Sequence, residues 1–178
     1  MLGTRIILMA LDDFPESAEA NVNAEVVAAA NHQIPLFWLI GFQLDDLQVF
    51  TVAESDDNAF NHGTGSGYPI LIARKDALVQ VLDQRRLFLQ EQISEADSEL
   101  LQRWQLFLAE LAQPVVAIDT YELWCSMADP EQLQRDLKRE LMLCGLIDQG
   151  KAEPAFEQLS AAGRWQGGNG IALAGFGW

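Results

Sequence analysis

Carboxylates are the residues of this chain whose types and spacing offer the most chemistry. Asp119, Glu122 and Asp129 lie close together in the sequence, among aromatic residues. Two neighbouring carboxylates can carry out acid–base catalysis when their surroundings separate their pKa values. Asp119 and Asp129 also stand where helix caps occur, each just before a helical segment. The sequence leaves both interpretations open: a small carboxylate-dependent hydrolase or transferase, or structural caps, which the cap positions favour.

Histidine and cysteine are too sparse and too widely spaced to indicate a metal site. The chain has two of each, His32, His62, Cys125 and Cys144, with no CxxC or HxxxH pair. Zinc modules need such closely spaced ligands. We therefore predict no metal, no cofactor and no catalytic residue. The two thiols are expected to be reduced, with Cys144 on the apolar face of a helix as a core residue.

A glycine-rich run at 63–67 could be taken for a phosphate-binding loop. That mechanism requires a strand before the loop and a helix N-terminus after it. Here Tyr68 and Pro69 follow, at the start of a predicted strand. The run instead predicts the end of a flexible acidic and glycine-rich insertion loop, residues 54–67, within a single domain spanning 1–178.

Negative charge is concentrated in the first third of the chain. The protein has 26 acidic residues and 11 lysines and arginines, a net charge of −15. Residues 1–60 hold ten of the acids and one base, Arg5, so their net charge is 1 − 10 = −9. Such a field repels nucleic acid and anionic membranes and attracts basic proteins.

This charge predicts a surface that binds a basic protein, with two apolar residues at its centre. The alternative is that the acids only keep the protein soluble. The predicted partner-binding residues are Asp12, Asp13, Glu16, Asp45, Asp46, Glu54, Asp56, Asp57, Phe60 and Tyr68.

The densest basic residues are Arg74, Lys75, Arg85 and Arg86. Four charges against an acidic background do not make a nucleic-acid surface. We expect them to pair with the chain's own acids or to contribute to a dimer contact. A further alternative is a homodimeric structural or regulatory protein, joined through the apolar segment 34–42 or through the tail that ends at Trp178.

Hydropathy and capping patterns predict a mixture of strands and helices without regular alternation. Strands are expected at 4–11, 47–52, 68–73 and 115–118. Helices are expected at 24–31, 34–42, 76–92, from Ser94 to Pro114, and from Asp129 to Gly145, with a last strand or ordered arm in the tail. This pattern is typical of an α+β domain: a small, mostly antiparallel sheet packed against several helices.

No apolar run is long enough for a signal peptide or a membrane span, which predicts a cytoplasmic protein. In size, acidity and lack of catalytic motifs the chain resembles bacterial immunity proteins, which neutralise a toxin encoded beside them. Two short signatures, 34–39 (IPLFWL) and 118–124 (IDTYELW), also resemble a group of uncharacterised bacterial proteins. The first resemblance implies an immunity protein that occludes the active site of a cognate toxin, and neither implies a catalytic residue.

Overall fold

The computed structural model describes residues 4–15, 24–52 and 67–161. Within them, five antiparallel strands form one sheet in the order β2-β1-β5-β4-β3. The strands are β1 (Arg5–Leu11), β2 (Glu25–Asn31), β3 (Leu47–Thr51), β4 (Gly67–Arg74) and β5 (Val115–Asp119). The predicted α+β class is confirmed.

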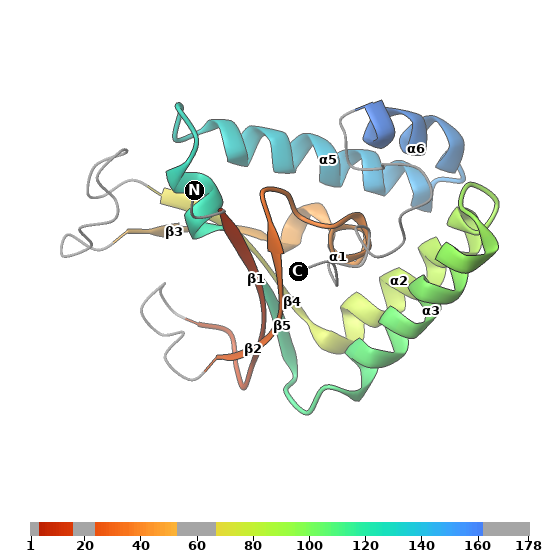
Figure 1. Ribbon diagram of the computed structural model, residues 1–178, viewed down its shortest axis with the longest axis horizontal. Helices are drawn as coiled ribbons and strands as arrows, with labels where there is room; N and C mark the ends of the chain where they lie inside the picture. The colour runs from red at the N-terminus through yellow and green to blue at the C-terminus, as the bar shows by residue number, and fades with distance from the viewer. Residues whose placement is uncertain (1–3, 16–23, 53–66, 162–178) are drawn as a thin grey trace.

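The helices account for most of the remaining described chain. They are α1 (Leu36–Leu39), the short 3-10 turn η2 (Leu44–Asp46), α2 (Lys75–Leu89), α3 (Glu95–Glu110), α4 (Tyr121–Cys125), α5 (Gln132–Asp148) and α6 (Ala152–Ala161). Figure 1 shows α5 and α6 along one edge of the molecule, and the paired helices α2 and α3 along another.

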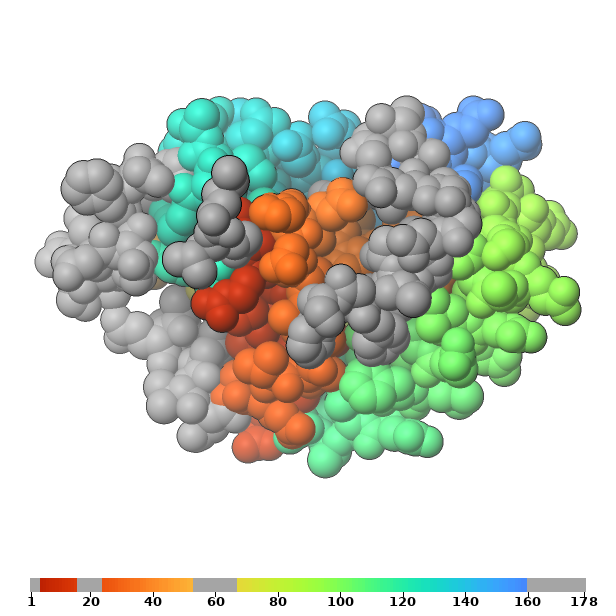
Figure 2. Space-filling view, viewed as in Figure 1, coloured from red at the N-terminus to blue at the C-terminus, as the bar shows by residue number. Residues whose placement is uncertain are grey.

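The core lies around β5 and β4, two of the three inner strands of the sheet. Every residue from Val115 to Ile118 and from Tyr68 to Ala73 is buried. A strand whose side chains are buried on both faces needs cover on both faces. Helices α2 and α5 both contact β4, while α4 contacts β1 and β4. Figure 2 shows red and orange atoms of the N-terminal part of the chain on the face in view, below the teal atoms and to the left of the green ones.

The prediction of a helix at 24–31 is wrong, because this segment is the edge strand β2. It pairs with β1 from Arg5↔Asn31 to Ala10↔Glu25, with a bulge beside Leu8 and Met9. Three consecutive alanines favour a helix locally. Val26 and Val27 favour a strand, and pairing with β1 decides the outcome because tertiary context overrides propensity.

The buried helical turn predicted at 34–42 is confirmed as α1, whose N-cap is Pro35. All residues from Ile34 to Phe42 are buried. Trp38 stacks on Trp104 with ring centroids 6.0 Å apart, and the Trp104 Nε1–H donates to the Phe37 carbonyl at 3.0 Å. Because this segment is enclosed, it cannot form the dimer contact considered above.

The predicted start is confirmed for α3 and is too early for α5. Ser94 is the N-cap of α3, and its Oγ accepts from the Asp97 backbone N–H at 3.2 Å. In α5, the predicted cap Asp129 lies one turn early and accepts from the Glu131 N–H, so the helix begins at Gln132.

The predicted end of α5 at Gly145 is wrong. The helix continues to Asp148, and Gly150, which has φ +75°, follows its C-cap Gln149. The Lys151 N–H donates to Leu146 O and the Gly150 N–H to Ile147 O, the two bonds of a Schellman motif. Helix α6 then follows, in a stretch for which no element was predicted. The glycine-rich tail from residue 167, where a last strand or ordered arm was expected, lies outside the described residues.

Candidate partner-binding surface

Most basic residues of the described chain make contacts with other groups of the same chain. Arg85 is 1% exposed, and its guanidinium donates to both carboxylate oxygens of Asp148, at 2.9 and 2.7 Å. Its Nη1 also donates to the carbonyls of Ile40 and Phe42, at 2.8 Å each. Arg85 therefore joins α2, the end of α5 and the segment after α1.

The prediction that the basic residues pair with the chain's own acids is confirmed for Arg85 and Arg86, whereas Lys75 and Arg74 contact a backbone carbonyl and an aromatic ring. Arg86 pairs with Asp83 at 3.3 Å, and Lys75 Nζ donates to the Leu111 carbonyl at 2.7 Å. Arg74 lies over the Phe14 ring, 5.7 Å from its centroid.

The acids that form ion pairs with basic residues lie late in the sequence. Further ion pairs join Arg5 to Glu122, Arg135 to Asp129 and Glu131, and Arg139 to Asp136. Across the described ranges, every acid in an ion pair is at position 83 or beyond. None of the described acids of the first third is in an ion pair there, although the charge of Arg85 acts on the Asp46 carboxyl.

Three of these early acids gather where β1 ends; we call Asp12, Asp13 and Glu25 the β1-end acidic group. Asp12 and Asp13 follow β1 and are exposed, and Glu25 is exposed opposite Ala10 of β1. Asp13 Oδ1 accepts from the Phe14 N–H at 2.8 Å, and Glu25 accepts from Gln113 Nε2 at 2.8 Å. Glu25 was not among the predicted binding residues.

Asp45 and Asp46 lie in η2, just before β3, and not beside Asp12 and Asp13. Two strands, β5 and β4, separate β1 from β3. At about 4.8 Å per strand this places the two acidic sites at least about 14 Å apart. The described acids therefore occupy two places instead of one patch.

Asp46 has a structural role in η2. Its Oδ2 accepts from the Gln43 N–H at 2.7 Å, within a capping box. Burial raises the pKa of the Asp46 carboxyl, although that hydrogen bond opposes the shift. Asp45, in contrast, is exposed.

Tyr68 is in the core and not at the surface. It is 4% exposed and packs against Phe50, Tyr121 and Trp124, with ring centroids 6.4, 5.2 and 6.0 Å away. A side chain enclosed in this way cannot form the centre of an interface. The predicted residues Glu16, Glu54, Asp56, Asp57 and Phe60, and the loop at 54–66, lie outside the described residues.

The carboxylates considered for acid–base chemistry are held by the chain itself. Asp119 is half-buried and precedes Thr120, the N-cap of α4, and its Oδ1 accepts from the Tyr121 N–H at 2.8 Å. Burial raises the pKa of Asp119. Glu122 accepts from Arg5 N, Nε and Nη2 at 2.9, 3.0 and 2.7 Å, and the side-chain bond lowers the pKa of Glu122.

The opposite pKa shifts have structural causes: the hydrogen bond from Arg5 lowers the pKa of Glu122, and burial raises the pKa of Asp119 against the hydrogen bond from Tyr121. Both oxygens of Glu122 accept from Arg5, and one oxygen of Asp119 accepts from the Tyr121 N–H. Asp129 likewise accepts from a backbone N–H and pairs with Arg135.

The cysteines are not joined to each other: Cys144 is buried in the core and Cys125 is half-buried. Among the residues that the structure describes, no group of three or more His, Cys, Asp or Glu side chains is arranged to hold a metal ion. Within the same residues, no helix combines the length and apolarity needed to cross a membrane.

Comparison with known proteins adds no relative: no family model, curated protein or solved structure matches this chain.

Proposed function

We propose that this protein is a cytoplasmic immunity protein that binds and neutralises a basic bacterial toxin through the acidic residues of its first third. The observation that supports this proposal is the division of charge. Asp12, Asp13 and Asp45 are exposed and take part in none of the ion pairs of the described chain, whereas five arginines pair with later acids: Arg5, Arg85, Arg86, Arg135 and Arg139.

Exposed carboxylates without internal partners suit a surface that meets lysines and arginines of another protein. Complementary charge accelerates association and selects the partner. A toxin that acts on an anionic substrate would present such basic groups around its active site, so the same contact would occlude that site.

Affinity also requires an apolar centre, because charges at the rim contribute little. Phe14 follows Asp13 and is 36% exposed, and Leu44 precedes Asp45 and is 44% exposed. Phe14 and Leu44 therefore replace Tyr68, which the sequence alone predicted, as the candidate apolar centre of the interface. The anchor for the β1-end acidic group is thus Phe14.

The test is co-expression with the product of the gene beside its own. We expect the wild-type protein to restore growth and to co-purify with that product. The double variant Asp12→Asn/Asp13→Asn should do both less well. The matched control is Glu153→Gln/Glu157→Gln, which removes two exposed charges from α6.

Equal loss in both double variants would show that net charge matters and that the β1-end acidic group does not. Absence of both rescue and co-purification by the wild-type protein would contradict the immunity role.

A further inference from the structure

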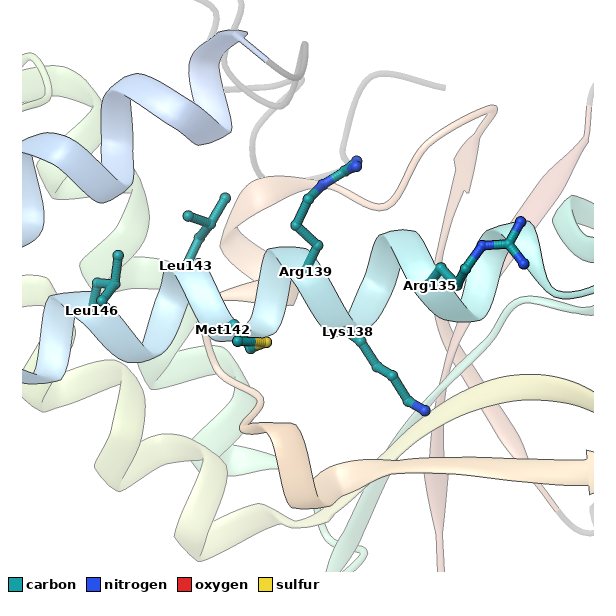
Figure 3. Close-up of a pocket in the computed structure, with 6 residues that line it drawn as sticks. All are labelled: Arg135, Lys138, Arg139, Met142, Leu143 and Leu146. Atoms are coloured by element: carbon teal, nitrogen blue, oxygen red, sulfur yellow. The ribbon is translucent and has the colours of Figure 1, made fainter.

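The outer face of α5 is open but does not define a ligand. A cavity of about 420 Å³ lies there, lined by residues of α5 between Arg135 and Leu146. Figure 3 shows Lys138 and Arg139 on opposite sides of the helix, and Arg139 already pairs with Asp136. Nothing in the described chain indicates what would cover this face, whereas the outer edge of the sheet carries more information.

The sheet ends at β2, which pairs with β1 alone among the described strands. The contacts that β2 makes with other elements are chiefly with β1. Figure 1 shows β2 at the lower left of the molecule, away from α5 and α6. An edge strand without cover is a surface on which another extended chain can pair.

The pairing with β1 shows which backbone groups of β2 the sheet uses. The His32 N–H donates to the Thr4 carbonyl at 2.8 Å, in continuation of the register of the two strands. Hydrogen-bonded and non-hydrogen-bonded pairs alternate along an antiparallel ladder. Counting back from His32, Ala30 and Ala28 are therefore the residues whose backbone groups bond to β1.

The N–H groups of Ala29 and Asn31 consequently point away from β1, toward the outer side of the sheet. Within residues 4–15, 24–52 and 67–161, no carbonyl accepts from either N–H. The Asn31 carbonyl accepts from the Gln33 N–H at 2.9 Å. Free backbone donors at a sheet edge are the groups that bind an added strand.

The side chains of β2 leave this edge unprotected. Natural edge strands commonly carry lysine, proline or other charges that prevent pairing. Residues 26–30 are two valines and three alanines, and Val26 is 62% exposed. A bulge interrupts the pairing with β1 near Val27, and from Ala28 to Asn31 the register is regular. The regular part of β2 is thus open to another strand.

Charge at one end of the edge indicates what kind of strand it accepts. Glu25 begins β2 and belongs to the β1-end acidic group, together with the exposed Asp12 and Asp13. Glu25 lies four residues before Ala29, about 13 Å along a strand. An extended segment of about seven residues covers β2 from end to end. Such a segment reaches these acids if it has a lysine or arginine at its Glu25 end.

A second copy of this chain suits the edge less well. Symmetric antiparallel pairing of two β2 strands would place Asn31 of one copy beside Glu25 of the other, and β2 has no lysine or arginine. The acids of both copies would then have no counter-charge in the contact. Two chains of net charge −15 also repel each other.

We infer that β2 accepts an additional strand from a basic protein, with the lysines or arginines of that strand at the β1-end acidic group. The contact rests on the proposed function, because the basic protein is the partner proposed above. Backbone hydrogen bonds to Ala29 and Asn31 hold the strand, and the acids select it by charge.

The first experiment is amide hydrogen exchange of the full chain, alone and with the product of the neighbouring gene. In the free protein, the Ala29 and Asn31 amides should exchange faster than those of Ala28 and Ala30, which bond to β1. In the complex, the Ala29 and Asn31 amides should exchange at least about tenfold more slowly. This readout needs no variant.

The second experiment removes one outward donor and measures binding of the same product by calorimetry. Ala29→Pro deletes an N–H that the β1 ladder does not use, and proline is tolerated on edge strands. It should weaken binding about tenfold, the effect of losing a backbone hydrogen bond at an interface. The matched control Ala29→Ser keeps the N–H and a small side chain and should bind like the wild type. Thermal melting checks that both variants fold.

The outcomes separate this contact from the proposed function. If Asp12→Asn/Asp13→Asn weakens binding while Ala29→Pro does not, and the two outward amides gain no protection, the added strand is excluded and the immunity role stands. Slow exchange of both amides in the free monomer would show that the edge is not open. A dimer in light scattering that Ala29→Pro dissociates would make the occupant a second copy. Absence of binding by the wild type would overturn both proposals.

Discussion

The end of α5 and the end of β1 use charge in opposite ways. At the end of α5, Asp148 receives two hydrogen bonds from Arg85, whose remaining donors reach two backbone carbonyls. At the end of β1, Asp12 and Asp13 are exposed and have no basic partner in the described chain. Charge in the first region stabilises the fold, and charge in the second is available to a partner.

Removing the buried guanidinium should have the largest effect. Arg85→Met leaves the carbonyls of Ile40 and Phe42 without their donor and Asp148 without its base. We expect a loss of about 3 kcal/mol in the free energy of unfolding, measured by chemical denaturation. The Asp148 side chain is 39% exposed, so water replaces part of the hydrogen bonding that its carboxylate loses.

The neighbouring Arg86 provides the control for that experiment. Its partner Asp83 is 58% exposed, and its buried Nε has no hydrogen-bond partner. Arg86→Met should therefore cost less than about 1 kcal/mol. Equal losses in the two variants would remove the distinction between structural and surface charge.

Replacing the glycine of the Schellman motif that follows α5 should have the next largest effect on stability. Gly150 has φ +75°, where an L side chain is strained, so Gly150→Ala should destabilise the protein by about 1 kcal/mol. Gly145 lies inside α5 with open space around its Cα, so Gly145→Ala should stabilise by about 0.5–1 kcal/mol. Thermal melting of both variants measures the difference, and shifts of the same sign would contradict this account of the helix end.

The pH dependence of stability should separate Glu122 from Asp119. Arg5 lowers the pKa of Glu122 in the folded state, so this carboxylate stabilises the fold above its unfolded pKa and loses that effect as pH falls. Burial raises the pKa of Asp119, so its contribution has the opposite sign and becomes less favourable as pH rises through its unfolded pKa.

Glu122→Gln should therefore destabilise the protein most at neutral pH and progressively less in acid. Asp119→Asn should become more stable relative to wild type as pH rises. Melting temperatures between about pH 3 and 7 span the ordinary pKa values of both carboxyls. Parallel pH profiles for the two variants would contradict the opposite shifts.

Local signals in the sequence predicted much of the fold. The strand at 47–52 followed from alternation, since Phe50 and Val52 are buried while Val49 and Thr51 are exposed. Ser94 predicted the start of α3 because its side chain forms the cap. The edge strand β2 was not predicted because its three alanines favour a helix. Only pairing with β1, which the linear sequence does not show, makes the segment a strand.

The candidate surface was less predictable, because the linear sequence does not show which charges meet. Arg85 and Asp148 are 63 residues apart, and no local pattern joins them. Tyr68 was expected at the surface because it follows a glycine-rich run, yet β4 lies between β3 and β5 and encloses it. Asp12 and Asp13 were identified correctly as exposed acids, since charged residues that end an apolar strand lie at the surface.

The most direct test of the central claim is the association rate with the product of the neighbouring gene, measured by stopped flow at low and at physiological ionic strength. Our account predicts that Asp12→Asn/Asp13→Asn slows association severalfold at low ionic strength and less at physiological salt, while Glu153→Gln/Glu157→Gln changes it little. The same association rate for both double variants at every ionic strength would contradict a binding role for the acids that follow β1.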